Sequence, residues 1–202
     1  MAAPKRMIEI YSQKIDAYWF GIACDNHGIF ASSFGVTQER VLTNISSYLP
    51  FNVPFQVFHE ASAVAKNIIA SLKSIYDGQE VSRNFPLVLT RFPAYTQKVL
   101  KATAQIPIGY LTTYGSIAKA VGGGPRAVGN IMATNPFAPI VPCHRVVKSD
   151  FGLGGYGGGL KVKIELLRKE KRGFLTPKKL EVGSNQLQVF PVEYTLRFLP
   201  CH

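Results

Sequence analysis

The run Gly122-Gly123-Gly124-Pro125 limits most strongly how this chain of 202 residues can fold. Consecutive glycines end a helix, and proline is favoured at the first position of the next one. Apolar residues at helical spacing precede the run, and Thr113 can cap the helix that they form. Residues 126–133 fit a second helix that ends before Pro136. The run therefore predicts two short helices around a glycine turn, which is either a helix-turn-helix or an ordinary helical hairpin.

The charge distribution favours a helix-turn-helix that meets a polyanion. The net charge is +11. Residues 1–90 hold seven basic and seven acidic residues, whereas residues 91–202 hold sixteen basic and five acidic ones. A neutral half joined to a basic half indicates nucleic acid ahead of anionic lipid, although a solvated basic surface is the alternative. The second helix begins with Arg126, Ala127 and Gly129, and such small side chains favour close approach to DNA over the reading of base edges.

The first 90 residues have a different pattern. Short apolar runs between Met7 and Phe34 alternate with turn formers and predict two or three antiparallel strands, with a hairpin at residues 25–28. Residues 59–75 change to helical spacing and predict a helix on that sheet. Residues 84–90 look extended, and the pattern turns helical from Phe92. We expect a domain boundary near residue 90.

Cys143 lies in an apolar segment, residues 140–147, that Cys143, His144 and Arg145 interrupt. A free thiol is mostly protonated at neutral pH, so a nucleophilic cysteine needs a base or a positive field beside it. His144 and Arg145 can supply both, although such a pair is more often a buried thiol beside a core histidine. We therefore consider Cys143 a candidate nucleophile.

Residues 152–157 match the dinucleotide-binding pattern of glycines only formally. That pattern needs a strand, a turn and a helix, whereas here more glycines follow and the cysteine segment precedes. Glycines around Tyr156 favour a loop whose backbone lies against a flat ligand, with a flexible surface loop as the alternative. Residues 160–170 then predict a helix with Leu160 buried and Glu170 at its solvated end.

The remaining sequence features argue against several other classes of protein. Cys24, Cys143 and Cys201 are too few and too scattered for a disulfide framework. A zinc site has only Cys24, His27 and His59 as candidates, one ligand short of the usual four, so we expect no metal. Without a signal peptide or an apolar run long enough for a membrane span, we expect a soluble intracellular protein.

From Phe92 onward the sequence resembles the O6-alkylguanine-DNA alkyltransferases. The resemblance is close over residues 92–174 and extends to the first 90 residues only in layout. Its motifs occur in the family's order and spacing: Tyr114, then Arg126-Ala127-Val128-Gly129, then Asn135-Pro136, then Pro142-Cys143-His144-Arg145-Val146, then Tyr156 with Gly158-Gly159-Leu160, then Glu170.

The resemblance implies a role for each matching residue. Cys143 would accept the alkyl group, His144 and Glu170 would draw its proton through a water, and Asn135 would hold the turn before the acceptor segment. Tyr114 would assist rotation of the flipped nucleotide and donate to the departing guanine. The base pocket would be formed by Tyr156, Arg145 and main-chain groups near Val146 and Gly157. Arg126, with Ala127, Gly129 and Tyr114, would meet the DNA, and the Arg126 side chain would replace the flipped nucleotide.

The resemblance also implies the architecture, which is an α/β (α+β) fold. Residues 1–90 would form a small antiparallel sheet with a helix, of RNase H-like type, and residues 91–175 a helical domain with a winged helix-turn-helix. Residues 176–202 have no counterpart in the family that we can assign, and the β-like run at residues 187–190 indicates a tail that adds an edge strand or is partly disordered. The implied function is single-turnover transfer of an alkyl group from O6-alkylguanine in double-stranded DNA to Cys143. We expect the protein to be a monomer that needs no cofactor. We expect it in the cytoplasm or, in a eukaryote, in the nucleus.

Two other functions remain open at this point. A Cys-His hydrolase or amidotransferase would form a thioester at Cys143 and turn over repeatedly, but it gives no role to Arg126 or to the basic half. A non-enzymatic helix-turn-helix protein would bind DNA lesions without transfer. Lesion-sensing relatives of that kind lack the acceptor cysteine, which this chain has.

Overall fold

The computed structural model describes residues 7–81 and 84–199, which fall into two compact units. Unit 1 comprises the described residues of Met1–Ile75, Val81–Leu89 and Pro136–Ile140. Unit 2 comprises the described residues of Tyr76–Glu80, Thr90–Asn135 and Val141–His202. The chain therefore passes from one unit to the other several times.

Unit 1 is built on a four-stranded sheet. Strands β1 (Ile8–Ile15), β2 (Tyr18–Asp25) and β3 (Gly28–Gly35) are consecutive and antiparallel, and β4 (Phe55–Phe58) pairs parallel with β1 to give the order β3-β2-β1-β4. The β2–β3 hairpin turns at the expected residues, where the backbone N–H of His27 donates to the Asp25 carboxylate at 2.8 Å. Gly28, at φ 141°, is required there because a Cβ would lie 2.1 Å from the Pro86 carbonyl oxygen.

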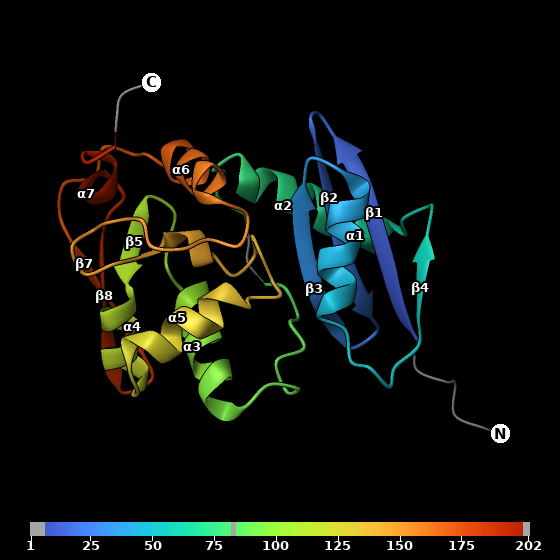
Figure 1. The fold of residues 1–202 in the computed structure, drawn as a ribbon, viewed down its shortest axis with the longest axis horizontal. Coiled ribbons are helices and arrows are strands. Elements are labelled where there is room, and N and C mark those ends of the chain that lie inside the picture. The colour runs from blue at the N-terminus through green and yellow to red at the C-terminus, as the bar shows by residue number, and fades with distance from the viewer. Residues whose placement is uncertain (1–6, 82–83, 200–202) are drawn as a thin grey trace. The chain divides into compact units, whose positions relative to one another are not determined.

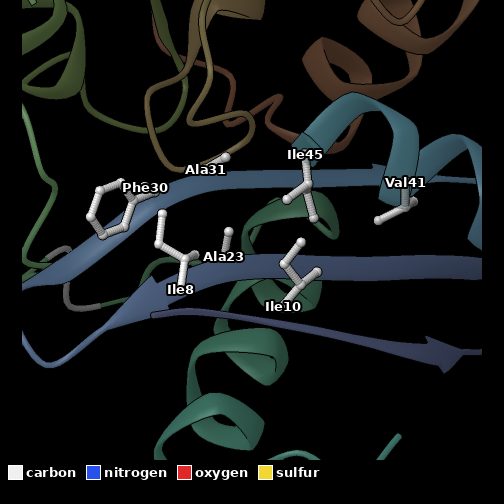
Figure 2. Packing of buried hydrophobic residues seen from close by; sticks show 7 residues of the cluster. All are labelled: Ile8, Ile10, Ala23, Phe30, Ala31, Val41 and Ile45. Atoms are coloured by element: carbon white, nitrogen blue, oxygen red, sulfur yellow. The ribbon is translucent and has the colours of Figure 1, made fainter. Parts of the chain in front are cut away.

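Two helices complete unit 1. Helix α2 (Ala63–Tyr76) follows the expected helical spacing, whereas α1 (Gln38–Ser47) was not expected because it has few apolar residues. Thr37 caps α1 by accepting from the Arg40 backbone N–H. Figure 2 shows Val41 and Ile45 pointing from α1 toward the sheet, where they pack in one apolar cluster with Ile10.

A short segment from far along the chain adds to unit 1 beside β3. The backbone N–H of Ser32 donates to the Pro136 carbonyl at 2.8 Å, and the Ser32 hydroxyl donates to the Ala138 carbonyl at 3.0 Å. Phe137 between them is fully buried. The chain therefore enters unit 1 at Pro136 and leaves it again after Ile140, just before Cys143.

Unit 2 combines helices with a second four-stranded sheet (Figure 1). The helices are α3 (Ala94–Ala104), α4 (Tyr114–Val121), α5 (Pro125–Ala133), α6 (Leu160–Lys169) and α7 (Glu193–Leu196). The strands are β5 (Tyr110–Thr113), β6 (Val146–Val147), β7 (Lys178–Val182) and β8 (Asn185–Pro191), in the order β6-β5-β8-β7. The expected mixed α/β class and the two helices around the glycine turn are confirmed.

The C-terminal segment is part of this sheet. Strand β8 pairs antiparallel with β5, and β7 forms a hairpin with β8. Across the described residues, no helix is long and apolar enough to cross a membrane. Within the same residues, no group of three His, Cys, Asp or Glu side chains is placed to hold a metal ion.

Candidate active site

The glycine turn joins α4 and α5 with the caps that the sequence predicts. Thr113 accepts from the Ser116 backbone N–H at 3.0 Å, and Pro125 occupies the first turn of α5. Gly123 has φ 87°, and a Cβ there would lie 2.4 Å from the Tyr95 hydroxyl oxygen. Only glycine fits this turn, because both the backbone conformation and the Tyr95 ring exclude a side chain.

One face of α5 carries both an exposed arginine and part of a cavity wall. Gly129, Met132 and Ala133 line the cavity. Arg126 lies three residues before Gly129 and seven before Ala133, so it lies on the same face of the helix, one turn nearer its N-terminus. Arg126 and Ala127 are exposed. The guanidinium is therefore free to meet a ligand beside the cavity.

Asn135 closes the excursion of the chain into unit 1. Its side-chain amide donates to the Val141 carbonyl at 2.8 Å, which ties the end of α5 to the residue two before Cys143. Cys143 begins a single 3₁₀ turn, Cys143–Arg145, which continues directly into β6. The position of the thiol is thus fixed by hydrogen bonding on one side and by a buried strand on the other.

The Cys143 thiol is held largely in its neutral form. It is only 7% exposed, and this burial raises its pKa. A hydrogen bond with Asn135 and the positive charge of Lys163 act in the opposite direction but do not overcome burial. A reaction at this sulfur therefore requires a group that removes its proton.

His144 and Glu170 form a buried hydrogen-bonded pair. Nε2 of His144 lies 2.9 Å from Oε1 of Glu170, and both side chains are buried. Burial lowers the pKa of His144, so the imidazole is neutral at neutral pH. Its Nδ1 atom is also buried, with no hydrogen-bond partner among the described residues.

Arg145 holds the Glu170 carboxylate from the other side. Its Nε donates to Oε2 at 2.7 Å and its Nη2 to Oε1 at 2.6 Å, while Nη1 donates to the Ile106 carbonyl. Burial alone would raise the pKa of Glu170, but Arg145 and His144 together lower it to about 2. Glu170 ends α6 at 1% exposure, so the expectation of a solvated carboxylate is wrong.

Lys163 is a second buried cation of the site, and sequence reasoning missed it. Its ammonium donates to the carbonyls of Val146 and Leu153, each at 2.6 Å, and to that of Gly155 at 3.3 Å. Burial lowers its pKa to about 8. The sequence pattern put Leu160 inside, but Leu160 is 49% exposed and Lys163 is fully buried.

The glycine loop after β6 forms the far side of the cavity. Gly154, at φ 66°, would place a Cβ 3.0 Å from the Tyr114 hydroxyl, so only glycine lets the loop pack against that ring. Burial raises the pKa of Tyr114 and of Tyr156, so both phenols remain protonated donors. The cavity has a volume of about 460 Å³, and its lining is Tyr114, Gly129, Met132, Ala133, Cys143, Lys148, Gly154, Gly155, Tyr156 and Gly157.

The residues singled out in the sequence therefore occupy three places. Five of them line the cavity: Tyr114, Gly129, Cys143, Tyr156 and Gly157. Outside its lining, the buried residues are Asn135, His144, Arg145, Val146 and Glu170, while Arg126 and Ala127 are exposed on α5. Met132, Ala133 and Lys148 also line the cavity without having been expected, because nothing in their sequence neighbourhood marks them. Lys163 had a signal, since it shares the helical stripe of Leu166, Leu167 and Glu170.

Known proteins are similar to this chain in sequence. The family model described as the DNA-binding domain of 6-O-methylguanine DNA methyltransferase matches residues 94–172. A methylated-DNA–protein-cysteine methyltransferase of Methanothermobacter thermautotrophicus is 34% identical over 146 residues, covering 71% of this chain and 78% of that protein. The Mycobacterium leprae protein of the same name is 40% identical over 144 residues, covering 67% of this chain and 84% of that protein.

Solved structures agree with the sequence relatives. A variant of the Mycobacterium tuberculosis O6-methylguanine methyltransferase superposes with a TM-score of 0.64 at 28% identity, covering 84% of this chain and 96% of that one. The Pyrococcus kodakaraensis O6-methylguanine-DNA methyltransferase shares the fold, with a TM-score of 0.63 at 24% identity and coverage of 81% and 99%. The chain belongs to the methylated-DNA–protein-cysteine methyltransferase family.

Proposed function

We propose that this protein repairs DNA by transferring an alkyl group from O6 of guanine to Sγ of Cys143. The observation that carries the proposal is the position of Cys143 in the wall of a cavity, beside a buried His144–Glu170 pair. A volume of about 460 Å³ is within the range of roughly 300–1,000 Å³ usual for small-ligand sites, so one extruded base is a suitable occupant.

The reaction is a displacement at the alkyl carbon. Sγ of Cys143 forms a bond to this carbon while the bond from the carbon to O6 breaks, and the electron pair of that bond stays with guanine. The thiol loses a proton and the departing guanine gains one, so the protons balance. A soft thiolate and donors to the leaving base are the groups that this chemistry requires.

His144 and Glu170 provide the path for the thiol proton. Because Nε2 of His144 faces Glu170, the acceptor nitrogen of the neutral ring is Nδ1, which has no protein partner among the described residues. A water bridging Nδ1 and the thiol would take up the proton as the sulfur attacks. The imidazolium that forms is stabilised by the Glu170 carboxylate, which Arg145 keeps ionised.

The phenols and the loop backbone act on the base. Tyr114 is protonated and lines the cavity, so its hydroxyl is available to donate to the guanine ring as negative charge develops there. Tyr156 forms a wall of the pocket, and the main chain at Gly157 reads the edge of guanine. Val146, which the resemblance also implied, lies outside the cavity lining, and its carbonyl accepts from the Lys163 ammonium.

Helix α5 brings the base to the cavity. The reactive carbon is inside stacked DNA, so the nucleotide must be rotated out at a cost of a few kcal/mol. Arg126 lies on the cavity face of α5 and would fill the space that the base leaves. Ala127 and Gly129 are small enough for the helix to approach the minor groove closely, and duplex DNA with an O6-alkylguanine is thus the proposed partner.

The product explains why each molecule would act once. A thioether is not opened by thiol exchange, and water is a poor nucleophile toward its carbon. Cys143 is the cysteine of the cavity wall, whereas Cys24 is half-buried in unit 1, where burial raises its pKa to about 11. One chain carries all the proposed groups, so no second copy is required.

Two measurements on the same sample test the proposal. Intact and peptide mass spectrometry after incubation with a duplex containing O6-methylguanine should locate one added methyl group on Cys143. A titration with excess methylated duplex should reach a plateau near one repaired lesion per molecule. Continued linear product formation would indicate a turning-over enzyme, such as a Cys-His hydrolase, and an unmodified Cys143 would contradict the transfer itself.

A further inference from the structure

The C-terminal segment, residues 176–199, lies beyond the part of the chain that the family model matches, yet it is built into unit 2. Strand β8 pairs with β5, and β5 in turn pairs with β6, which directly follows the Cys143–Arg145 turn. The Thr112 hydroxyl donates to the Gln188 carbonyl at 2.6 Å. The Val192 N–H donates to the Gly109 carbonyl at 3.0 Å. The segment therefore supports the sheet behind the acceptor.

Three residues of the segment converge on Phe151. The Phe151 ring packs edge-on against Phe190 and Tyr194, with ring centroids 5.0 Å and 5.3 Å apart. The hydroxyl of Thr195, which is 1% exposed, donates to the Phe151 carbonyl at 2.9 Å. Each contact comes from β8 or α7, so the segment holds both the side chain and the backbone of this residue.

Phe151 needs this support because its backbone is strained. Its φ is 63°, in the left-handed region that a bulky side chain rarely occupies. Such a conformation persists when the surrounding structure determines it. The rings of Phe190 and Tyr194 and the hydroxyl of Thr195 provide that surrounding structure.

Phe151 in turn sets the course of the pocket loop. The loop that carries Phe151 runs from Lys148 to Gly157. Its first residue, Lys148, and its last four, Gly154–Gly157, line the cavity. The Phe151 N–H donates to the Lys148 carbonyl, and the Lys148 N–H donates to the Gly152 carbonyl. These two hydrogen bonds close a tight turn around Phe151. Leu153, two residues after Phe151, packs in the same apolar cluster as Val192, and its carbonyl accepts from the Lys163 ammonium.

We propose that the C-terminal segment positions the base-binding loop, with Thr195 and Tyr194 as its positioning residues. The inference rests on the proposed alkyl transfer and adds to it an element outside the matched family region. The contacts with Phe151 hold Gly154, Gly155 and Gly157 where they meet the base. Loosening these contacts weakens capture of the base and leaves the thiol chemistry unchanged.

The experiment compares two reagents at the same sulfur in the full-length chain. Free O6-benzylguanine must occupy the base pocket before it alkylates Cys143, whereas iodoacetamide alkylates the thiol without using the guanine site. The readout is the ratio of the two second-order rate constants, followed by peptide mass spectrometry at Cys143. Thr195→Val removes the hydroxyl at nearly constant volume, and Thr195→Ser retains it. Glu181→Gln, at an exposed position of the β7–β8 hairpin, is the control.

Thr195→Val should lower the benzylguanine-to-iodoacetamide ratio about fivefold, which corresponds to one buried hydrogen bond. Tyr194→Leu should lower it in the same direction, and Thr195→Ser and Glu181→Gln should leave it within twofold of the wild type. A melting temperature and a duplex affinity for each variant identify general unfolding. A ratio unchanged in Thr195→Val while its melting temperature falls would overturn the proposal, because the segment would then only stabilise the unit. A wild-type chain that reacts with iodoacetamide but never with benzylguanine or methylated duplex would overturn the proposed transfer itself, and this inference with it.

Discussion

Oε1 of Glu170 accepts from Nε2 of His144 at 2.9 Å, and Nη2 of Arg145 donates to the same oxygen at 2.6 Å. Three ionisable groups are thus buried in one contact, and their charges are arranged so that the carboxylate is ionised and the imidazole neutral. In the proposed reaction, this arrangement leaves Nδ1 of His144 as the ring nitrogen that receives the proton from Cys143. It also couples the proposed chemistry to the stability of the fold.

Glu170→Gln should slow methyl transfer to Cys143 by about 100-fold, the lower end of the effect expected for a lost acid–base group. The amide can still accept from His144 but cannot neutralise the imidazolium that forms as the thiol is deprotonated. The measurement is the single-turnover rate with methylated duplex. Glu165→Gln, a partly exposed carboxylate of the same helix, is the matched control and should retain the wild-type rate.

The same residue predicts how stability depends on pH. The pKa of Glu170 is about 2 in the folded chain against 4.5 ordinarily, so its stabilisation is present above pH 4.5 and is lost as pH falls toward 2. We expect a loss on the order of 2 kcal/mol in the free energy of unfolding over this range. The free energy of unfolding, measured by denaturant titration at several pH values, should therefore fall more steeply with falling pH in the wild type than in Glu170→Gln. Parallel curves would show that Glu170 is not the group responsible.

Arg126→Ala should separate DNA handling from chemistry. Arg126 is exposed on α5 and is not among the residues that line the cavity, so its loss should slow repair of methylated duplex about tenfold or more while sparing free O6-benzylguanine. The two rates are measured side by side on each variant. Lys119→Ala, a lysine of α4, is the charge control. Equal losses on both substrates would instead assign Arg126 to the chemical step.

Lys163→Met should slow transfer from methylated duplex and from free O6-benzylguanine equally. Removing the ammonium leaves the carbonyls of Val146 and Leu153 without their buried donor, so the pocket loop loses an attachment to β6. We expect about a tenfold loss of transfer together with a lower melting temperature, as for one or two unsatisfied buried groups. Lys161→Met, at an exposed position of the same helix, should be silent. A loss confined to duplex repair would contradict this role.

Cys143→Ser should abolish transfer and keep affinity for undamaged duplex, because in the proposed function binding depends on the basic residues and on α5. The affinity of either form should be nearly independent of sequence and should fall steeply with salt, since phosphate contacts release counterions. Fluorescence anisotropy at a series of ionic strengths measures both. A flat salt dependence would argue against the phosphate backbone as the main contact, and loss of binding with the thiol would show that the two functions are inseparable.

Local chemistry in the sequence determined the elements around the acceptor. The glycine run with Pro125 and the cap at Thr113 specify two short helices by backbone sterics and a single hydrogen bond, and the structure has both. The change of apolar period at residue 59 likewise predicts α2. Helix α1 was missed because only Val41, Leu42 and Ile45 among its ten residues are apolar.

Tertiary structure decided what the buried charged residues do. The sequence could nominate Cys143, His144 and Glu170, but only the fold joins residues 26 positions apart into one hydrogen bond. A charged side chain is expected at the surface, so position alone favoured a solvated Glu170, and Lys163 was not singled out. Burial of these charges is tolerated because distant partners satisfy them: three carbonyls for the ammonium, and Arg145 with His144 for the carboxylate. Whether such partners exist depends on how strands and loops are brought together, and no local pattern of residues encodes it.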